Sequence, residues 1–183
     1  KAAKAAALVL ASDLTDSQVA KSLKEFRGTW RRFEYKGETK EHAFVFDDYA
    51  HHPTAIQKTL AAARMQALIG GAPLIVVFQP HLYTRTRDLM EGFASAFSEA
   101  DEVVLAPIYA AREEPIPGVT SEELAKLITA HSTPAKAFPS LSEIETYLET
   151  VSNFRTRIIT MGAGDVYTIA EHLTDPSKFE KNV

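Results

Sequence analysis

Polar side chains suited to binding or catalysis follow four apolar runs of this 183-residue chain. They lie in residues 47–52 (Asp-Asp-Tyr-Ala-His-His), 79–87 (Gln-Pro-His-Leu-Tyr-Thr-Arg-Thr-Arg), 107–109 (Pro-Ile-Tyr) and 162–165 (Gly-Ala-Gly-Asp). If the apolar runs are parallel strands, their carboxyl ends meet at one edge of a sheet, where open α/β sheets bind ligands. The sequence therefore predicts one site that combines acids, histidines, arginine and tyrosine.

The two arginines of residues 79–87 suggest an anion. With Thr84 as N-cap, Arg85 and Arg87 would fall in the first turn of a helix, where the positive end of the helix dipole disfavours cations. A bound carboxylate or phosphate would reverse that balance. Residues two apart on a helix point to nearly opposite sides, so only one of the two should face the site. The alternative is that both are solvated surface arginines.

The acids and histidines of residues 47–52 allow two interpretations. Asp47 and Asp48 follow each other on a strand and should point to opposite faces, so one can reach a ligand while the other caps the next helix. His51 and His52, joined by His81, could instead hold a metal ion, as in a metallohydrolase. Adjacent histidines lack the i, i+4 spacing of a helical zinc site, which weakens the metal interpretation.

Several function classes are excluded or disfavoured. Residues 162–164 fail the G-x-G-x-x-G dinucleotide pattern, because the third glycine position is Tyr167. No glycine is followed by lysine, so a phosphate-binding P-loop is absent from this sequence. The chain has no cysteine and a formal charge of −4, which provides neither thiolate metal ligands nor a basic field for nucleic acid. Its longest apolar stretch, residues 5–11, is too short to span a bilayer. We expect a soluble cytoplasmic protein.

The elements that must position these residues alternate along the chain. Residues 30–35 and 43–46 read as neighbouring antiparallel strands joined by a turn at residues 36–38. Five short apolar strands alternating with helices then indicate a mostly parallel, Rossmann-like α/β sheet covered on both faces. These five strands are residues 43–46, 74–78, 103–106, 136–138 and 157–161. The predicted fold is a six-stranded sheet with one antiparallel strand.

The first residues are predicted to form a separate helical appendage. Thr15 with Gln18 makes a capping box, and alanine-rich residues 2–11 favour helix. The chain opens in mid-pattern at Lys1, so we expect a piece of a longer protein. Residues 1–27 are predicted to end a preceding domain, and residues 28–183 to form a domain of their own.

Residues 47–54 and 78–86 together resemble the C-terminal domain of the Mur ligase family. Supporting matches are residues 26–28, 31–34, 109–118 and 162–165, so the resemblance covers nearly the whole chain. The second motif is similar to that of the family branch that joins L-alanine to UDP-N-acetylmuramate. Leu82, Arg112 and Asp165 depart from the family pattern. Residues 1–27 resemble the end of the family's central ATPase domain.

The resemblance implies a ligase of bacterial peptidoglycan synthesis that uses ATP and Mg²⁺ as a full-length enzyme. ATP would phosphorylate the carboxylate of UDP-N-acetylmuramate, and the amine of L-alanine would attack the acyl phosphate. The resemblance implies ATP contacts for Arg32 and Asp48. It implies alanine contacts for Tyr49, His51, His81 and Arg85, with Arg85 pairing the carboxylate. It assigns no catalytic residue and no metal to this chain, which alone should be inactive.

Two other interpretations remain besides the metallohydrolase. A recycling ligase of the same family attaches a whole tripeptide to UDP-N-acetylmuramate, and its second motif should lack the arrangement of His81 and Arg85. A small-molecule binding module without catalysis would lack an upstream P-loop in the parent protein.

Overall fold

The computed structural model describes residues 15–25, 29–67 and 71–178. The chain divides into two compact units, residues 1–30 and residues 31–183. In the first unit, helix α2 (Asp16–Glu25) follows a capping box in which Gln18 N donates to Thr15 Oγ1 and Thr15 N donates to Gln18 Oε1. The predicted helix start at Thr15 is confirmed. The predicted helix over residues 2–11 lies outside the described residues.

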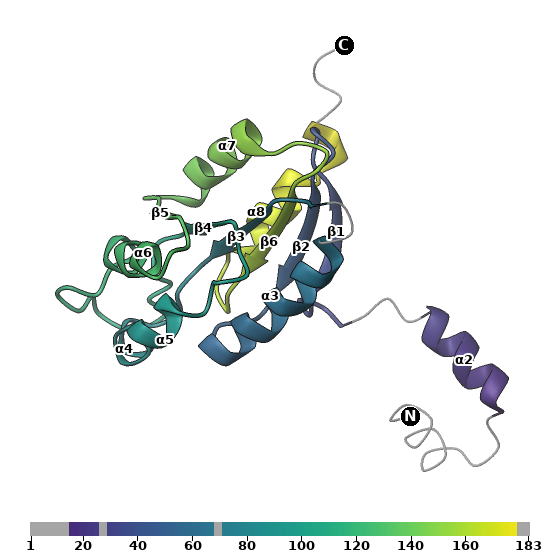
Figure 1. The fold of residues 1–183 in the computed structure, drawn as a ribbon, viewed down its shortest axis with the longest axis horizontal. Helices are drawn as coiled ribbons and strands as arrows, with labels where there is room; N and C mark the ends of the chain where they lie inside the picture. The colour runs from purple at the N-terminus through teal and green to yellow at the C-terminus, as the bar shows by residue number, and fades with distance from the viewer. Residues whose placement is uncertain (1–14, 26–28, 68–70, 179–183) are drawn as a thin grey trace. The chain divides into compact units, whose positions relative to one another are not determined.

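The second unit is built on a six-stranded sheet in the order β1-β2-β6-β3-β4-β5 (Figure 1). The strands are β1 (Glu34–Glu38), β2 (Phe44–Asp48), β3 (Leu74–Phe78), β4 (Glu102–Leu105), β5 (Ala135–Ala137) and β6 (Arg157–Met161). The β1–β2 pair is antiparallel and the other pairs are parallel. The predicted fold class is confirmed. Because β6 lies between β2 and β3, the carboxyl ends of β2, β6, β3 and β4 are neighbours.

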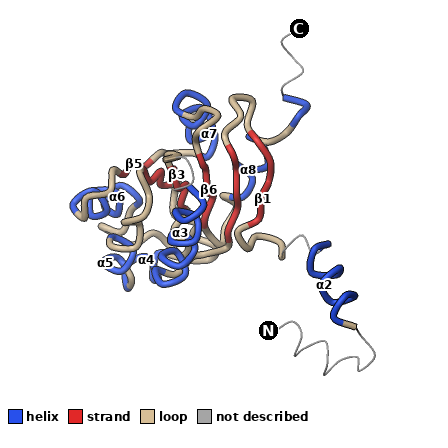
Figure 2. Tube along the Cα trace, turned by 45° about the vertical axis from the view of Figure 1, so that its right-hand side comes forward, coloured by secondary structure: helices blue, strands red, loops and turns tan. Residues whose placement is uncertain are grey.

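Helices cover both faces of this sheet (Figure 2). They are α3 (Pro53–Ala67), α4 (Tyr83–Asp88), α5 (Met90–Ala94), α6 (Ser121–Ala130), α7 (Leu141–Val151) and α8 (Tyr167–Leu173), with a 3₁₀ turn η1 (Pro176–Lys178). One buried apolar cluster joins α3, α5 and α6 to the sheet through side chains such as Ile56, Phe93 and Leu124. A second joins α7 and α8 to the other face through Ile144, Leu148 and Ile169. Within the described residues, no helix has the length and apolarity needed to cross a membrane.

Local capping explains where two of the later helices begin. Thr120 Oγ1 accepts from Glu123 N ahead of α6, and Ser140 Oγ accepts from Glu143 N ahead of α7. Each hydroxyl satisfies a backbone N–H that has no partner inside its helix. Thr120 and Ser140 are therefore the N-caps of α6 and α7.

The antiparallel hairpin differs from its prediction. Strand β1 begins at Glu34 rather than at residue 30, because Arg31 and Phe33 adopt positive φ angles of 53° and 48°, which a strand does not accommodate. The expected turn at residues 36–38 lies inside β1, where Gly37 marks a bulge. The chain turns instead at residues 39–43, closed by a hydrogen bond from Thr39 N to Ala43 O.

The segment that precedes β1 is held by a buried ion pair. Arg31, 3% exposed, donates from Nε to Asp47 Oδ2 at 2.7 Å, and Asp47 is 1% exposed. The same guanidinium donates to Gly162 O at 2.6 Å and to Gly164 O at 3.1 Å. Burial raises the pKa of the Asp47 carboxyl, whereas hydrogen bonds from Arg31 and Thr160 favour its charged form. Arg31 therefore ties the start of the unit to β2 and to the turn after β6.

We predict that Asp47→Ala destabilises residues 31–178 by about 3–5 kcal/mol, because it leaves the Arg31 guanidinium buried without its counter-ion. Chemical denaturation followed by circular dichroism measures this. The matched control is Asp88→Ala, since Asp88 pairs with Arg87 at 2.8 Å on the surface. It should change the free energy of unfolding by less than about 1 kcal/mol. Equal effects of the two substitutions would contradict a structural role for the Arg31–Asp47 pair.

Candidate functional site

The two arginines before β1 point to different places. Arg31 is buried in the ion pair, whereas Arg32 is exposed and its guanidinium carbon lies 5.4 Å from the centre of the Tyr49 ring. Arg31 lies over the same ring at 5.2 Å. The Tyr49 ring thus contacts both a buried structural arginine and an exposed one, and Arg32 is the one that a ligand can reach.

Asp48, at the end of β2, holds backbone groups. Its Oδ2 accepts from Phe33 N and its Oδ1 accepts from Ala50 N, both at 2.8 Å. The carboxylate therefore fastens the segment before β1 to the end of β2. Capping of α3, the alternative considered from the sequence, is not what the carboxylate does.

His51 is oriented by the backbone of its own loop. Its Nδ1 lies 2.9 Å from Tyr49 O, and a carbonyl only accepts, so Nδ1 carries the proton. In the neutral ring, Nε2 is then left as an acceptor. The ring packs edge-on against Tyr49 at 5.1 Å and lies 6.3 Å from the ring of His81. The loops after β2 and β3 therefore meet at these rings.

His81 and Arg85 form the centre of the site. Arg85 NH1 lies 3.1 Å from His81 Nδ1, and a guanidinium only donates, so Nδ1 accepts and the proton of the neutral ring is on Nε2. Burial, the Arg85 cation and His51 lower the pKa of His81 from its ordinary value of 6.5, against an opposing effect of Glu113. The Tyr109 ring stacks on the His81 ring, with 5.5 Å between the ring centres and an angle of 11° between the ring planes.

Helix α4 differs from the prediction at its start. Thr84 is not the N-cap: α4 begins at Tyr83 after Leu82, whose φ is 70° and which makes no side-chain cap. Thr84 N and Thr84 Oγ1 both donate to the carboxylate of Glu113. A carboxylate of the protein itself therefore satisfies the first turn of α4, and the Arg85 guanidinium remains directed at His81. With six residues, α4 carries Arg85 and Arg87 in its last turn as well.

The two arginines of α4 diverge as the helical geometry predicts. Arg85 is partly buried and contacts His81, whereas Arg87 is exposed and pairs with Asp88.

The glycines after β6 are required for packing. A Cβ on Gly164 would lie 2.3 Å from Gln79 Oε1 and 2.7 Å from the Tyr109 ring. Gln79 holds this turn, because its Nε2 donates to Asp165 Oδ1 and its Oε1 accepts from Val166 N. The close approach of backbone to Gln79 and Tyr109 accounts for Gly164 without any phosphate.

The geometry does not favour a metal ion. Across residues 15–25, 29–67 and 71–178, no three or more His, Cys, Asp or Glu side chains are grouped to hold one. His81 directs Nδ1 at the Arg85 cation, which would repel a metal at that nitrogen.

A family model described as "Mur ligase, glutamate ligase domain" matches residues 31–164. The chain belongs to the Mur ligase family. This Mur ligase domain is 41% identical over 172 residues to the UDP-N-acetylmuramate–L-alanine ligase of Koribacter versatilis, covering 93% of the chain and 36% of that protein. It is 41% identical over 180 residues to the enzyme of that name from Mycolicibacterium smegmatis, covering 97% of the chain and 36% of that protein.

A solved structure agrees. The UDP-N-acetylmuramate-alanine ligase of Thermotoga maritima matches with a TM-score of 0.73 and 26% identity, covering 98% of this chain and 37% of that chain. The Mur ligase domain thus spans little more than a third of these relatives.

The structure brings five of the predicted residues into one cluster. Arg32, Tyr49, His51, His81 and Arg85 form a continuous series of ring and cation contacts along the carboxyl edge, and Asp48 anchors the loop that carries two of them. Sequence reasoning missed the structural roles of Arg31, Gln79 and Glu113. Their partners lie 16 to 133 residues away in the chain, so no local pattern marks them.

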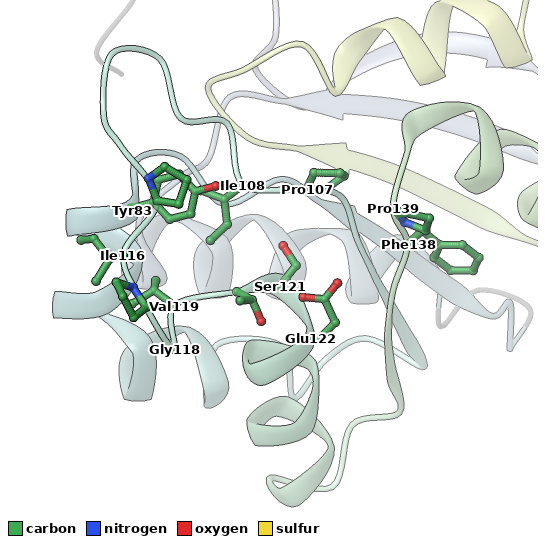
Figure 3. Close-up of a pocket in the computed structure, with 13 residues that line it drawn as sticks. Tyr83, Pro107, Ile108, Ile116, Gly118, Val119, Ser121, Glu122, Phe138 and Pro139 are labelled. Carbon is green, nitrogen blue, oxygen red and sulfur yellow. The ribbon is translucent and has the colours of Figure 1, made fainter.

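A pocket of the Mur ligase domain lies between α4 and the segment that follows β4. It has a volume of about 520 Å³ and is lined by Tyr83, by the segment after β4 and by Phe138 and Pro139 (Figure 3). None of the six residues predicted to bind ligands lines it. The pocket is therefore separate from the His81–Arg85 pair.

We predict that Arg85→Ala raises the pKa of His81 toward 6.5, because a neighbouring cation is removed and the ring becomes more exposed. NMR titration of the ring protons measures this, and Arg87→Ala should leave the pKa of His81 unchanged. In the wild type, the unfolded state binds more protons than the folded state between the two pKa values, so His81 lowers stability as pH falls below 6.5. A His81 pKa that is equal in wild type and Arg85→Ala would show that the contact is not maintained.

Proposed function

We propose that the protein carrying this domain is an ATP-dependent ligase that joins L-alanine to UDP-N-acetylmuramate in peptidoglycan precursor synthesis. The observation that carries the proposal is the half-buried Arg85, held by His81 at the carboxyl edge, in a domain 41% identical to ligases of that name. ATP converts the muramoyl carboxylate into an acyl phosphate. The alanine amine then attacks the acyl carbon, and phosphate leaves as the amide forms.

In this proposal Arg85 binds the carboxylate of L-alanine. One of its five N–H groups is directed to His81, and that contact orients the planar guanidinium while others stay available for a bidentate pair. His81 is held neutral by its surroundings, so it adds no competing cation. His51 Nε2 and the Tyr49 ring complete the alanine side. His51 and Tyr49 belong to the loop after β2. The His51 ring lies near the His81 ring, which in turn contacts Arg85.

In the same proposal, Arg32 and Asp48 bind ATP. Arg32 is exposed and cationic, as a phosphate contact requires. Both Asp48 oxygens accept backbone amides, yet a carboxylate oxygen can accept a further bond, so a ribose hydroxyl can still be bound. We assign the phosphate-binding loop and the Mg²⁺ ligands to the remainder of the protein, since this sequence has no Gly-Lys pair. The reaction takes place in the cytoplasm, where ATP is present.

The unit boundary supports a second part of the proposal. Residues 1–27 end the preceding central ATPase domain, and residues 28–183 form the amino-acid-binding domain. This domain alone is inactive, because it supplies the amino acid and only part of the ATP contacts.

The runner-up is the recycling ligase that attaches a tripeptide. Incubating the full-length protein with ATP, UDP-N-acetylmuramate and either L-alanine or the tripeptide distinguishes them. Amide formed with L-alanine and not with tripeptide supports the proposal. The reverse result, or no amide with either amine, would overturn it.

We predict that Asp48→Asn in the full-length protein raises the KM for ATP by about tenfold and the KM for L-alanine by less than twofold, because a neutral amide weakens a ribose contact. Asparagine keeps an acceptor oxygen for one of the two backbone amides, so it disturbs the fold less than alanine, which keeps none. Steady-state kinetics and a thermal melt measure the two effects. If both KM values rise together with a lowered melting temperature, Asp48 only holds the backbone.

We predict that Arg85→Ala raises the KM for L-alanine by more than about tenfold with little change for ATP. A desolvated charge pair typically contributes roughly 2–5 kcal/mol when one partner is truncated. Arg85→Lys should restore only part of the affinity, since an ammonium lacks the planar fork. The matched control is Arg87→Ala, which should be silent. Steady-state kinetics with L-alanine and alaninamide tests the assignment, and equal discrimination by wild type and Arg85→Ala would refute it.

A further inference from the structure

The loops that follow β3 and β4 are joined beyond the end of the sheet. Tyr109 N donates to Pro80 O at 2.8 Å, and Leu82 N donates to Tyr109 O at 2.9 Å. An isolated parallel bridge pairs His81 with Tyr109 at the same place. The loop after β4 therefore fixes the backbone of His81 directly, just before α4 begins.

Four residues later, the same loop reaches the first turn of α4. Glu113 Oε2 accepts from Thr84 N at 2.9 Å, and Glu113 Oε1 accepts from Thr84 Oγ1. The N–H groups of a helix's first turn have no partner within the helix, and Leu82 provides no side-chain cap. Both bonds lower the pKa of Glu113, so the carboxylate is charged at neutral pH. Glu113 acts as an N-cap supplied from 29 residues away.

Beyond Glu113, residues 115–120 line the pocket of about 520 Å³ together with Tyr83 (Figure 3). Ahead of this pocket, the two hydrogen bonds from Thr84 to Glu113 join the loop to α4.

Thr84 immediately precedes Arg85, and α4 is only six residues long. A helix this short is marginal without external contacts, so a shift of its first turn changes the direction of Arg85. We propose that Glu113 is a positioning residue for amino-acid binding: by clamping Thr84 it holds the Arg85 guanidinium against His81 in the orientation that receives the amino-acid carboxylate. The inference rests on the proposed function for its substrate, but the clamp itself is a property of this domain.

The kinetic test uses the full-length protein with Glu113→Ala, Glu113→Gln and Thr84→Val. Glu113→Ala should raise the KM for L-alanine by about tenfold, because small displacements of a binding group have large effects, while kcat and the KM for ATP change by less than about twofold. Glu113→Gln should restore most of the affinity, since its amide oxygen accepts from Thr84 N and its NH₂ donates to Thr84 Oγ1. Exposed Glu114→Ala is the control and should match wild type.

The combination of Thr84→Val with Glu113→Ala should be no worse than Glu113→Ala alone, because the Thr84 Oγ1 bond that the valine removes is one of the two bonds already lost with Glu113. An unchanged KM for L-alanine in Glu113→Ala would overturn the inference. So would a uniform rise of both KM values that glutamine does not rescue. Thr84→Val, which removes the Oγ1 bond and keeps the backbone bond, should raise the KM for L-alanine by a smaller factor than Glu113→Ala. Should Glu113→Ala fail to fold, a normal KM for L-alanine in Thr84→Val would overturn the inference as well.

A second measurement does not depend on the substrate. Glu113→Ala and Glu113→Gln both lack the negative charge, so any difference between them in the His81 pKa reports the position of Arg85. We expect a higher His81 pKa in the alanine variant, measured by NMR titration, because Arg85 moves away from the ring. Equal values would overturn the clamp. If wild type forms no amide with L-alanine, the proposed function fails and this titration alone decides the role of Glu113.

Discussion

The architecture of the site depends on one buried ion pair, between Arg31 and Asp47. Two charges removed from water are tolerated only with close partners and satisfied hydrogen bonds, and here the guanidinium also binds the carbonyls of Gly162 and Gly164. The pair therefore holds three segments together: the residues before β1, the end of β2 and the turn after β6. Arg31 O in turn accepts a hydrogen bond from Tyr49 N, so Arg31 also holds the loop after β2.

Contacts between the loops that follow the strands hold the rest of the carboxyl edge together. Gln79 joins the start of the β3 loop to Asp165 and Val166, and Tyr109 packs over Gly164 and stacks on His81. The result is a site whose polar groups come from four strand ends, as the order of the sheet requires. Arg32 contacts the Tyr49 ring and Arg85 contacts the His81 imidazole, rather than a carboxylate. Both guanidinium groups can therefore still bind anions.

Elements whose boundaries are decided by neighbouring residues were predictable. Strands β3 and β6 coincide with continuous apolar runs, and α6 and α7 begin after N-caps whose hydroxyls accept from the backbone N–H three residues later. The predicted starts of elements were wrong where a residue distant in the sequence determines them. Phe33 can adopt its positive φ because Asp48 accepts its N–H, which delays β1. Glu113 takes over the cap of α4, which displaces Thr84 from the role its local sequence indicates.

The sequence by itself determined the sheet type, the edge at which the chemistry lies and the residues resembling a Mur ligase motif, because apolar periodicity and capping act over a few residues. It singled out Arg32 and Asp48 only by resemblance and left open what their neighbours Arg31 and Asp47 do. Only the tertiary structure decided that, as it decided the tautomers of His51 and His81. The reason is physical: a buried charge goes where a counter-charge and free carbonyls are already placed, and those partners are brought together by folding rather than by sequence spacing.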